Sequence, residues 1–161
     1  MQFRDALPAD FSQILRLNEA SEHFLSALTP ERLDLLNDQS SHHRVLEVDG
    51  KVSAFLLAFR EGSAYDSVNY RWFADRFSKF IYVDRIVVSA TMRGSGVGKH
   101  FYADLFSFAR LDRVELVACE IDSDPPNELS RHFHSRLGFV EVGTQRVGYV
   151  KKVVSLQTLR L

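Results

Sequence analysis

The sequence has little cysteine and no long apolar run. Its 161 residues include a single cysteine, Cys119, so no disulfide can form within the chain. Cys119 lies in the apolar stretch VELVACEI, which favours a small buried side chain over a nucleophile. No stretch approaches the roughly 18 apolar residues of a membrane span. The N-terminal MQFRDALPAD has an acidic residue and a proline, whereas a signal peptide has an uninterrupted apolar region. A cytoplasmic protein without a membrane partner is therefore expected.

An excess of one charge sign is also absent. Lys and Arg number 20 and Asp and Glu number 21, which gives a net charge of −1. No global field therefore attracts nucleic acid or an acidic membrane, and any anionic ligand must be held by local groups. The histidines do not form a metal-binding pattern, because the adjacent His42 and His43 point to opposite sides of a strand. With no H-x-x-x-H pattern and no cysteine pair, no metal site is predicted.

Apolar periodicity and length predict one α/β domain over residues 1–161. Strands are expected over 1–6, 80–89, 113–121, 139–145 and 148–159, with a hairpin over 43–60 that turns at Asp49-Gly50. Helices are expected within 7–25, 29–39, 96–110 and 126–136. Segment 61–80 fits neither period, and its aromatic residues suit either packing on the domain or one wall of a substrate site.

Three glycines follow the strand predicted over 80–89, at Gly94, Gly96 and Gly98. A strand, a glycine loop and a helix start together present free backbone N–H groups and the positive end of a helix dipole to an anion. A P-loop is excluded, because Lys99 is followed by His100 instead of a hydroxyl residue. A dinucleotide-binding loop is excluded, because the spacing is G-x-G-x-G and the loop lies past the middle of the chain. A tight turn without a ligand remains as an alternative.

The spacing Arg93-x-x-Gly96-x-Gly98 resembles the R/Q-x-x-G-x-G/A signature of the GNAT superfamily of coenzyme A-dependent N-acyltransferases. A second family marker is matched by NELSRHFHSRLGF over residues 127–139, although His134 stands where the family frequently has tyrosine. The resemblance covers nearly the whole chain. It implies an α/β (α+β) GNAT-fold domain, with a mixed, mostly antiparallel sheet of about six to seven strands flanked by about four helices.

The resemblance also implies which residues bind coenzyme A. The glycine loop would hold the pyrophosphate, and the strand end would pair its backbone with the pantetheine arm. The implied cofactor-binding residues are Ile86, Val87, Val88, Arg93, Gly94, Ser95, Gly96, Val97, Gly98, Lys99, Asn127, Ser130 and Arg131.

Helical geometry checks the second marker independently. At about 100° per residue, Asn127, Arg131 and His134 share one polar face, which would be turned to the cofactor. The residues Leu129, Phe133 and Leu137 share another face, which is expected to enter the core. For Arg131, a solvated position is the alternative.

Acyl transfer to an amine requires removal of a proton from the amine, stabilisation of an oxyanion and departure of a thiolate. Asp84 is the favoured base, with a structural carboxylate paired to Arg85 as the alternative and Glu120 as the second candidate. The resemblance implies that the backbone N–H of Val88 stabilises the oxyanion. His134 is the favoured acid, because histidine ordinarily has a pKa of about 6.5, with a binding or a structural role as alternatives.

The sequence therefore predicts an N-acetyltransferase that moves acetyl or a short acyl group from acetyl-CoA to a primary amine by direct attack. No serine lies in a G-x-S-x-G elbow that would indicate an acyl-enzyme. A noncatalytic coenzyme A-binding or protein-interaction domain is the alternative, and a nucleotide binder the weaker one. The acceptor, a small-molecule or peptide amine, should meet the regions around His23 and Phe24, segment 65–73 and the last strand pair. The resemblance allows a homodimer through that pair.

Overall fold

Seven strands form one sheet in the computed structural model, which describes residues 1–148 and 152–161. The strands lie in the order β1-β2-β3-β4-β5-β7-β6, and all described neighbours are antiparallel except β4 and β5. The strands are β1 (Gln2–Asp5), β2 (His42–Val48), β3 (Lys51–Arg60), β4 (Ile81–Val88), β5 (Leu116–Asp124), β6 (Val140–Val147) and β7 (Lys152–Arg160). The expected mixed, mostly antiparallel sheet is confirmed.

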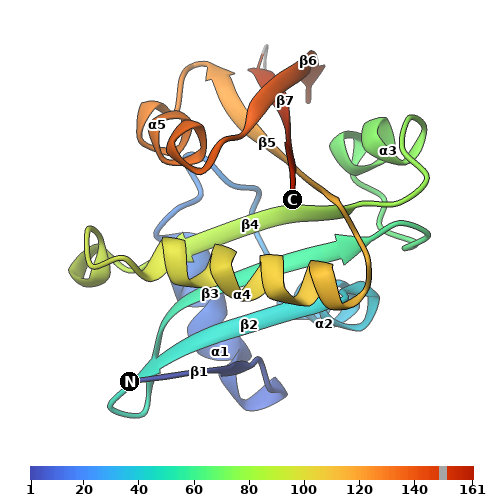
Figure 1. Ribbon diagram of the computed structural model, residues 1–161. Coiled ribbons are helices and arrows are strands. Elements are labelled where there is room, and N and C mark those ends of the chain that lie inside the picture. The colour runs from blue at the N-terminus through green and yellow to red at the C-terminus, as the bar shows by residue number, and fades with distance from the viewer. Residues whose placement is uncertain (149–151) are drawn as a thin grey trace.

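The described residues form five α-helices and two short 3-10 turns around this sheet. The α-helices are α1 (Phe11–Glu19), α2 (Pro30–Gln39), α3 (Val68–Ala74), α4 (Val97–Leu111) and α5 (Glu128–Leu137). Figure 1 shows α4 across one face of β2 and β3, α1 and α2 on the opposite face, and α5 beside β5. None of the helices in the described part of the chain has the length and apolar character needed to cross a bilayer.

Strand β3 packs against helices on both faces, which explains its continuous apolar sequence. Leu56 and its even-numbered neighbours belong to the core cluster that contains Phe101 and Leu105 of α4. Phe55 belongs to the cluster that contains Ile14 of α1 and Leu33 of α2. Because successive side chains of a strand point to opposite faces, one apolar strand supplies both layers.

Strands β4 and β5 pair over only three residues, from Ile81↔Val117 to Val83↔Cys119. Beyond Val83 the two strands diverge, as Figure 1 shows. Ser89 N–H donates to Ser53 O of the β3 side at 2.9 Å. Because N–H groups alternate along a strand, those of Ile86 and Val88 point toward the side that β5 has left. The divergence therefore opens the sheet beside the last residues of β4.

Segment 61–80 contains the short helix α3, and its rings enter an aromatic core cluster. Ser67 caps α3 by accepting a hydrogen bond from the Tyr70 backbone N–H at 3.3 Å. The rings of Tyr65 and Phe59 stack with centroids 4.2 Å apart. The first predicted helix is shorter than expected, since α1 ends at Glu19 and turns follow it. Residues 149–151 of the strand predicted over 148–159 lie outside the described residues.

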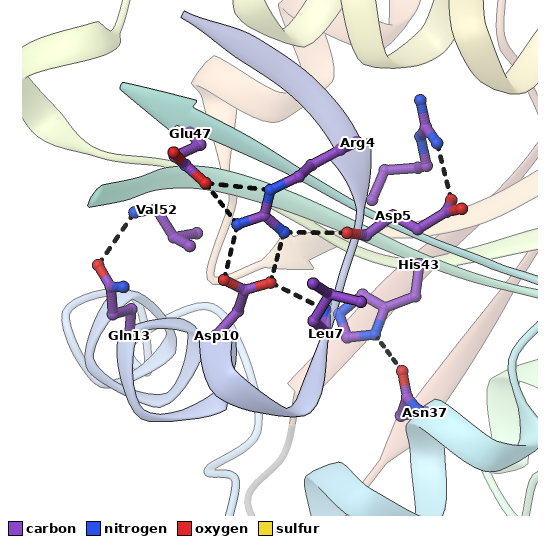
Figure 2. A network of polar contacts seen from close by, with 10 residues as sticks. Arg4, Asp5, Leu7, Asp10, Gln13, Asn37, His43, Glu47 and Val52 are labelled. Atoms are coloured by element: carbon purple, nitrogen blue, oxygen red, sulfur yellow. Dashed lines mark hydrogen bonds and ion pairs between the residues drawn. The ribbon is translucent and has the colours of Figure 1, made fainter. Parts of the chain in front are cut away.

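Arg4 connects the edge strand β1 with the 3-10 turn Pro8–Asp10 that follows it (Figure 2). Its guanidinium donates to both carboxylate oxygens of Asp10, at 2.7 and 2.8 Å, and its Nε donates to Glu47 at 3.0 Å. The same view shows the buried His43, whose Nδ1 lies 2.8 Å from Oδ1 of Asn37. These polar contacts fix β1 and α2 against β2.

Candidate active site

A cavity of about 980 Å³ occupies the opening between β4 and β5. The glycine loop, the start of α4 and the start of α5 line one part of it, and the loop before α2 and the start of α3 line another. Most residues predicted from sequence lie on its wall: Asp84, Ile86, Val87, Val88, Arg93, Gly94, Gly96, Val97, Gly98, Lys99, Glu120, Asn127, Ser130 and His134. The structure therefore gathers the two signature segments, 31 residues apart at Gly96 and Asn127, around one cavity.

Two different constraints require glycine at the three positions of the loop. Gly94 and Gly96 have φ of +79° and +85°, the left-handed region in which a side chain is strained. Gly98 instead lies against α5, because a β-carbon at this position would be 2.9 Å from Cζ of Phe133. The loop thus leaves the backbone N–H groups at the start of α4 uncovered by side chains.

Two predicted binding residues, Ser95 and Arg131, do not line the cavity. The Ser95 hydroxyl donates to the Met92 carbonyl at 2.6 Å. The Arg131 guanidinium is exposed and lies 3.7 Å from the Glu128 carboxylate, one helical turn away. The exposed position of Arg131 therefore agrees with the alternative that its side chain is solvated. The cations on the cavity wall near the loop are Arg93, Lys99 and Arg136.

The faces of α5 differ from those expected. Asn127 caps the helix, accepting the Ser130 N–H at 3.1 Å. The prediction that Leu129 enters the core is wrong, because Leu129 is 78% exposed. Phe133 and Leu137 do pack on the core. Leu129 lies in the first turn of α5 and lines the cavity, so it faces an open space instead of the core.

His134 is buried, with 4% of its surface exposed, and both of its ring nitrogens have partners. Nδ1 lies 2.8 Å from the Ser130 carbonyl oxygen, which can only accept, so Nδ1 carries the proton. Nε2 therefore accepts from the Tyr102 hydroxyl at 2.7 Å. Burial lowers the pKa of His134. The ring is thus a neutral link between α4 and α5, a geometry that favours the structural reading over that of an acid.

Asp84 holds two segments of the cavity wall with its two carboxylate oxygens. Oδ1 accepts a short hydrogen bond from the Tyr65 hydroxyl, and Oδ2 accepts from Nε of Arg85 at 2.6 Å. The side chains of Asp84 and Arg85 are 4% and 3% exposed. The pairing with Arg85 was the structural alternative for Asp84. Because both oxygens are engaged, this carboxylate is less available as a base.

Glu120 faces the same cavity from β5, just past the last pair between β4 and β5. Its carboxylate accepts a short hydrogen bond from the Tyr82 hydroxyl. Removal from water raises the pKa of Glu120 to about 7, and the negative charge of Asp84 contributes to the rise. A carboxyl group with a pKa near neutrality is suited to taking up a proton and releasing it again at physiological pH.

Among the polar residues of the wall, sequence reasoning included Tyr65 and Asn69 only as part of the acceptor segment 65–73, and it did not single out Arg85 or Tyr102 as site residues. Tyr102 lies one helical turn after Gly98, so helical spacing from the glycine loop could have found it. Tyr65 and Asn69 lie in the irregular segment, where no period indicates direction. Arg85 had been considered only as a partner of Asp84.

The residues present fit coenzyme A. The left-handed glycines form a cradle that a β-carbon would disturb, cations flank it, and the N–H groups of Ile86 and Val88 point to the open side of β4. Burial raises the pKa of the Cys119 thiol well above its usual value, which does not suit a nucleophile. Within the described residues, His, Cys, Asp and Glu form no group of three placed to hold a metal ion.

Comparison with solved structures finds the same fold repeatedly. Ard1 from Thermoplasma volcanium superimposes with a TM-score of 0.81 at 17% identity, covering 99% of this chain and 97% of that one. A ribosomal-protein-alanine N-acetyltransferase from Brucella melitensis gives 0.74 at 22% identity, with 100% of both chains covered. The putative acetyltransferase yncA from Salmonella typhimurium, solved with its cofactor acetyl-CoA, gives 0.74 at 19% identity, covering 100% of this chain and 94% of that one. Comparison with curated protein sequences finds no match.

The family comparison agrees with the fold and with the two signature segments. The profile of the acetyltransferase (GNAT) family matches residues 5–139, which include the glycine loop and the whole of α5. The chain therefore belongs to the GNAT acetyltransferase family.

Proposed function

We propose that the protein is an acetyl-CoA-dependent N-acetyltransferase that acetylates a primary amine by direct attack within a ternary complex. The observation that carries this proposal is the single cavity in which the glycine loop and the Asp84–Glu120 carboxylates lie together. A cavity with only a phosphate cradle would support binding alone. The second group, a buried carboxyl with a raised pKa, supports proton transfer as well.

Coenzyme A would be held by the glycine loop, by Arg93 and Lys99, and by the open edge of β4. When bound there, it supplies an acetyl thioester to the interior of the cavity. The N–H of Val88 points toward the open side of β4, so it suits the oxyanion role that the family resemblance implies for it. Asn127 and Ser130, on the opposite wall, are the polar groups of α5 for the pantetheine arm.

Glu120 is the base in this proposal, and Asp84 raises its pKa and attracts the amine. An ammonium group enters with a pKa of ~10.4, about 3 units above that of Glu120, so its proton does not move without help. The apolar wall beside the carboxylates, which includes Phe24, Val68 and Val154, lowers the pKa of an ammonium by excluding water. Tyr82 holds the Glu120 carboxylate in position through its hydroxyl.

His134 acts as a positioning residue in this proposal. A thiolate can leave near neutral pH without an acid, because the pKa of a thiol is only ~8.5. The neutral ring of His134 instead joins Tyr102 on α4 to α5, and so fixes the distance between the two cofactor-binding segments. The acceptor is a small-molecule or peptide amine that enters beside the loop before α2.

The test is an assay of free thiol during incubation with acetyl-CoA and pooled primary amines, together with calorimetric titration of coenzyme A. We expect coenzyme A binding, turnover with at least one amine, and loss of turnover but not of binding in Glu120→Gln. Coenzyme A binding without turnover on any amine would support the noncatalytic alternative. Binding of ATP with magnesium in place of coenzyme A would favour a nucleotide binder and overturn the proposal.

A further inference from the structure

A second hollow of about 280 Å³ lies away from the cofactor cavity, at the beginning of β5. Four cationic residues line it: Arg76, Lys79, Arg113 and Arg160. Among the described residues on its wall, Glu115 is the only acidic one. The chain as a whole has a net charge of −1, so this concentration of positive charge is local and is not a general property of the surface.

The hollow and the glycine loop lie at opposite ends of the central strands. The N-terminal residues of β4 and β5 pair at Ile81↔Val117, and Arg160 of β7 pairs with Leu116 at the same end. The glycine loop follows Val88, at the far end of the eight-residue strand β4. At about 3.3 Å per residue, the two places are separated by roughly 25 Å along the strand. A ligand in one therefore does not touch the other.

The cations are not neutralised within the protein. Among the described residues, none of the four has a carboxylate oxygen within the 4.0 Å of an ion pair. Most other arginines in or beside the sheet do have such a partner, as Arg4, Arg44, Arg60 and Arg85 show. The hollow therefore gathers positive charge that no ion pair between described residues neutralises.

One of the four cations is held in place before any ligand binds. The Arg76 guanidinium lies over the Trp72 ring, 3.9 Å from its centroid, and donates to the Trp72 carbonyl oxygen at 2.9 Å. Arg113 has a left-handed backbone, with φ of +54°, at the end of α4. Glycine is the residue that usually takes this position after a helix, so an arginine here is disfavoured by the backbone. An arginine therefore occupies a position at which the backbone conformation favours glycine.

We propose that this hollow is a second anion-binding site, for a compact ligand that carries a phosphate or pyrophosphate group. Guanidinium groups donate in pairs to phosphate oxygens, and three of the four cations are arginines. The cations surround a hollow instead of forming a stripe across the surface, which favours a small ligand over a long polyanion. This site is independent of the proposed acetyltransferase function.

The test is calorimetric titration of the full chain with sodium pyrophosphate at constant ionic strength, with and without saturating coenzyme A. Coenzyme A keeps pyrophosphate out of the glycine loop, so we expect one saturable site to remain in its presence. Arg113→Gly and Arg76→Ala should each weaken that site by about tenfold, the loss expected for one charge-assisted hydrogen bond. Arg113→Gly should also leave the protein at least as stable, because glycine suits the left-handed backbone.

Arg71→Ala is the matched control, since Arg71 is exposed like Arg76, lies in the preceding helix α3 and does not line the hollow. An absence of saturable binding with coenzyme A present, or an equal loss in Arg71→Ala and Arg76→Ala, would overturn the proposal. The proposed acetyltransferase function fails separately, as an absence of coenzyme A binding. In that case the comparison of Arg113→Gly with Arg71→Ala, made without coenzyme A, still decides whether the second site exists.

Discussion

Nη1 of Arg85 donates a 2.7 Å hydrogen bond to Oδ1 of Asn18, and this buried contact fixes the loop that follows α1. The same guanidinium reaches the carbonyl and the hydroxyl of Ser26, at 3.2 and 3.1 Å, while its Nε is paired with Asp84. One arginine of β4 therefore connects a carboxylate of the candidate site with a wall of the cavity that the acceptor would meet.

Arg85→Lys should separate acceptor binding from cofactor binding. Lysine keeps the charge beside Asp84, but all its donors lie on one nitrogen, so it does not reproduce the spread of the guanidinium donors over Asn18 and Ser26. We expect the KM of the acceptor to rise by about tenfold, as for the loss of one or two charge-assisted hydrogen bonds, with the Kd of coenzyme A unchanged. Steady-state kinetics and calorimetry measure the two quantities. Arg16→Lys, on the exposed side of α1, is the control. An equal change in the KM of the acceptor and the Kd of coenzyme A in Arg85→Lys would contradict a role of Arg85 in acceptor binding.

Glu120→Gln should lower kcat by about 10²- to 10⁴-fold, the usual contribution of a general base, while coenzyme A still binds.

The pH dependence gives a sharper test of the role of Asp84. In the wild type, activity should rise with pH as Glu120 loses its proton near pH 7. Because the charge of Asp84 raises the pKa of Glu120, Asp84→Asn should move this rise to lower pH. If Asp84 were itself the base, Asp84→Asn would abolish activity at every pH.

Gly98→Ala should push α5 away from α4. The added methyl group would lie 2.9 Å from the Phe133 ring, so we expect a loss of about 1–3 kcal/mol of stability and weaker coenzyme A binding. A second change, Phe133→Leu, should restore part of both losses, because the smaller side chain makes room. Gly94→Ala is the control, since its cost comes from a φ of +79° and no neighbour lies within 4 Å. Thermal unfolding should show rescue by Phe133→Leu for Gly98→Ala and none for Gly94→Ala.

The local patterns of the sequence were enough to predict the glycine loop and one α/β domain, and the family resemblance supplied the fold. Gly94, Gly96 and Gly98 lie within five residues, and the left-handed backbone of Gly94 and Gly96 is a property of the loop itself. The close approach of Gly98 to Phe133 of α5, in contrast, could not be predicted from the loop. Strand β3 was identifiable as central because it is apolar on both faces. Such features depend on neighbours in the sequence or on alternation, and both can be read without a structure.

The roles that we propose for Asp84 and Glu120 could not be predicted in this way. It depends on where β4 and β5 separate, after Val83↔Cys119, which is a property of strand register. The engagement of Asp84 by Tyr65 depends on an irregular segment without a period. Likewise, the orientation of His134 follows from a tyrosine 32 residues earlier in the chain, and the helical wheel of α5 contains no information about it.

His134→Phe tests whether His134 positions α5 or supplies a proton. The change leaves the buried Tyr102 hydroxyl without an acceptor, so we expect a loss of about 1–3 kcal/mol of stability. The double variant Tyr102→Phe/His134→Phe should be less destabilised than the sum of the two single variants, because both lose the same bond. If His134 positions α5, kcat below the unfolding temperature should stay within about tenfold of the wild type. A fall of the kind expected for a lost general acid, about 10²-fold or more, would instead establish the catalytic role.

His43 should make the protein sensitive to acid in a defined range of pH. The ring is buried, Nδ1 is bonded to Asn37, and Nε2 has no partner among the described residues (Figure 2). Burial lowers the pKa of His43 to about 4, against 6.5 in the unfolded chain, although the charge of Asp10 opposes this. Above pH 6.5 both states are neutral and His43 has no effect on stability. As the pH falls below 6.5, the unfolded chain binds the proton first, so the free energy of unfolding decreases.

The full decrease between pH 6.5 and 4 should be about 3 kcal/mol from His43 alone, and burial of His42 and His134 contributes with the same sign. His43→Gln removes this titration while keeping a donor for Asn37, so its stability should depend less steeply on pH over that interval. His132→Gln, at an exposed position of α5, should keep the slope of the wild type. Urea unfolding at half-unit steps from pH 7.5 to 4 measures the three slopes, and a His43→Gln slope equal to that of the wild type would mean that the buried ring is protonated in the folded state.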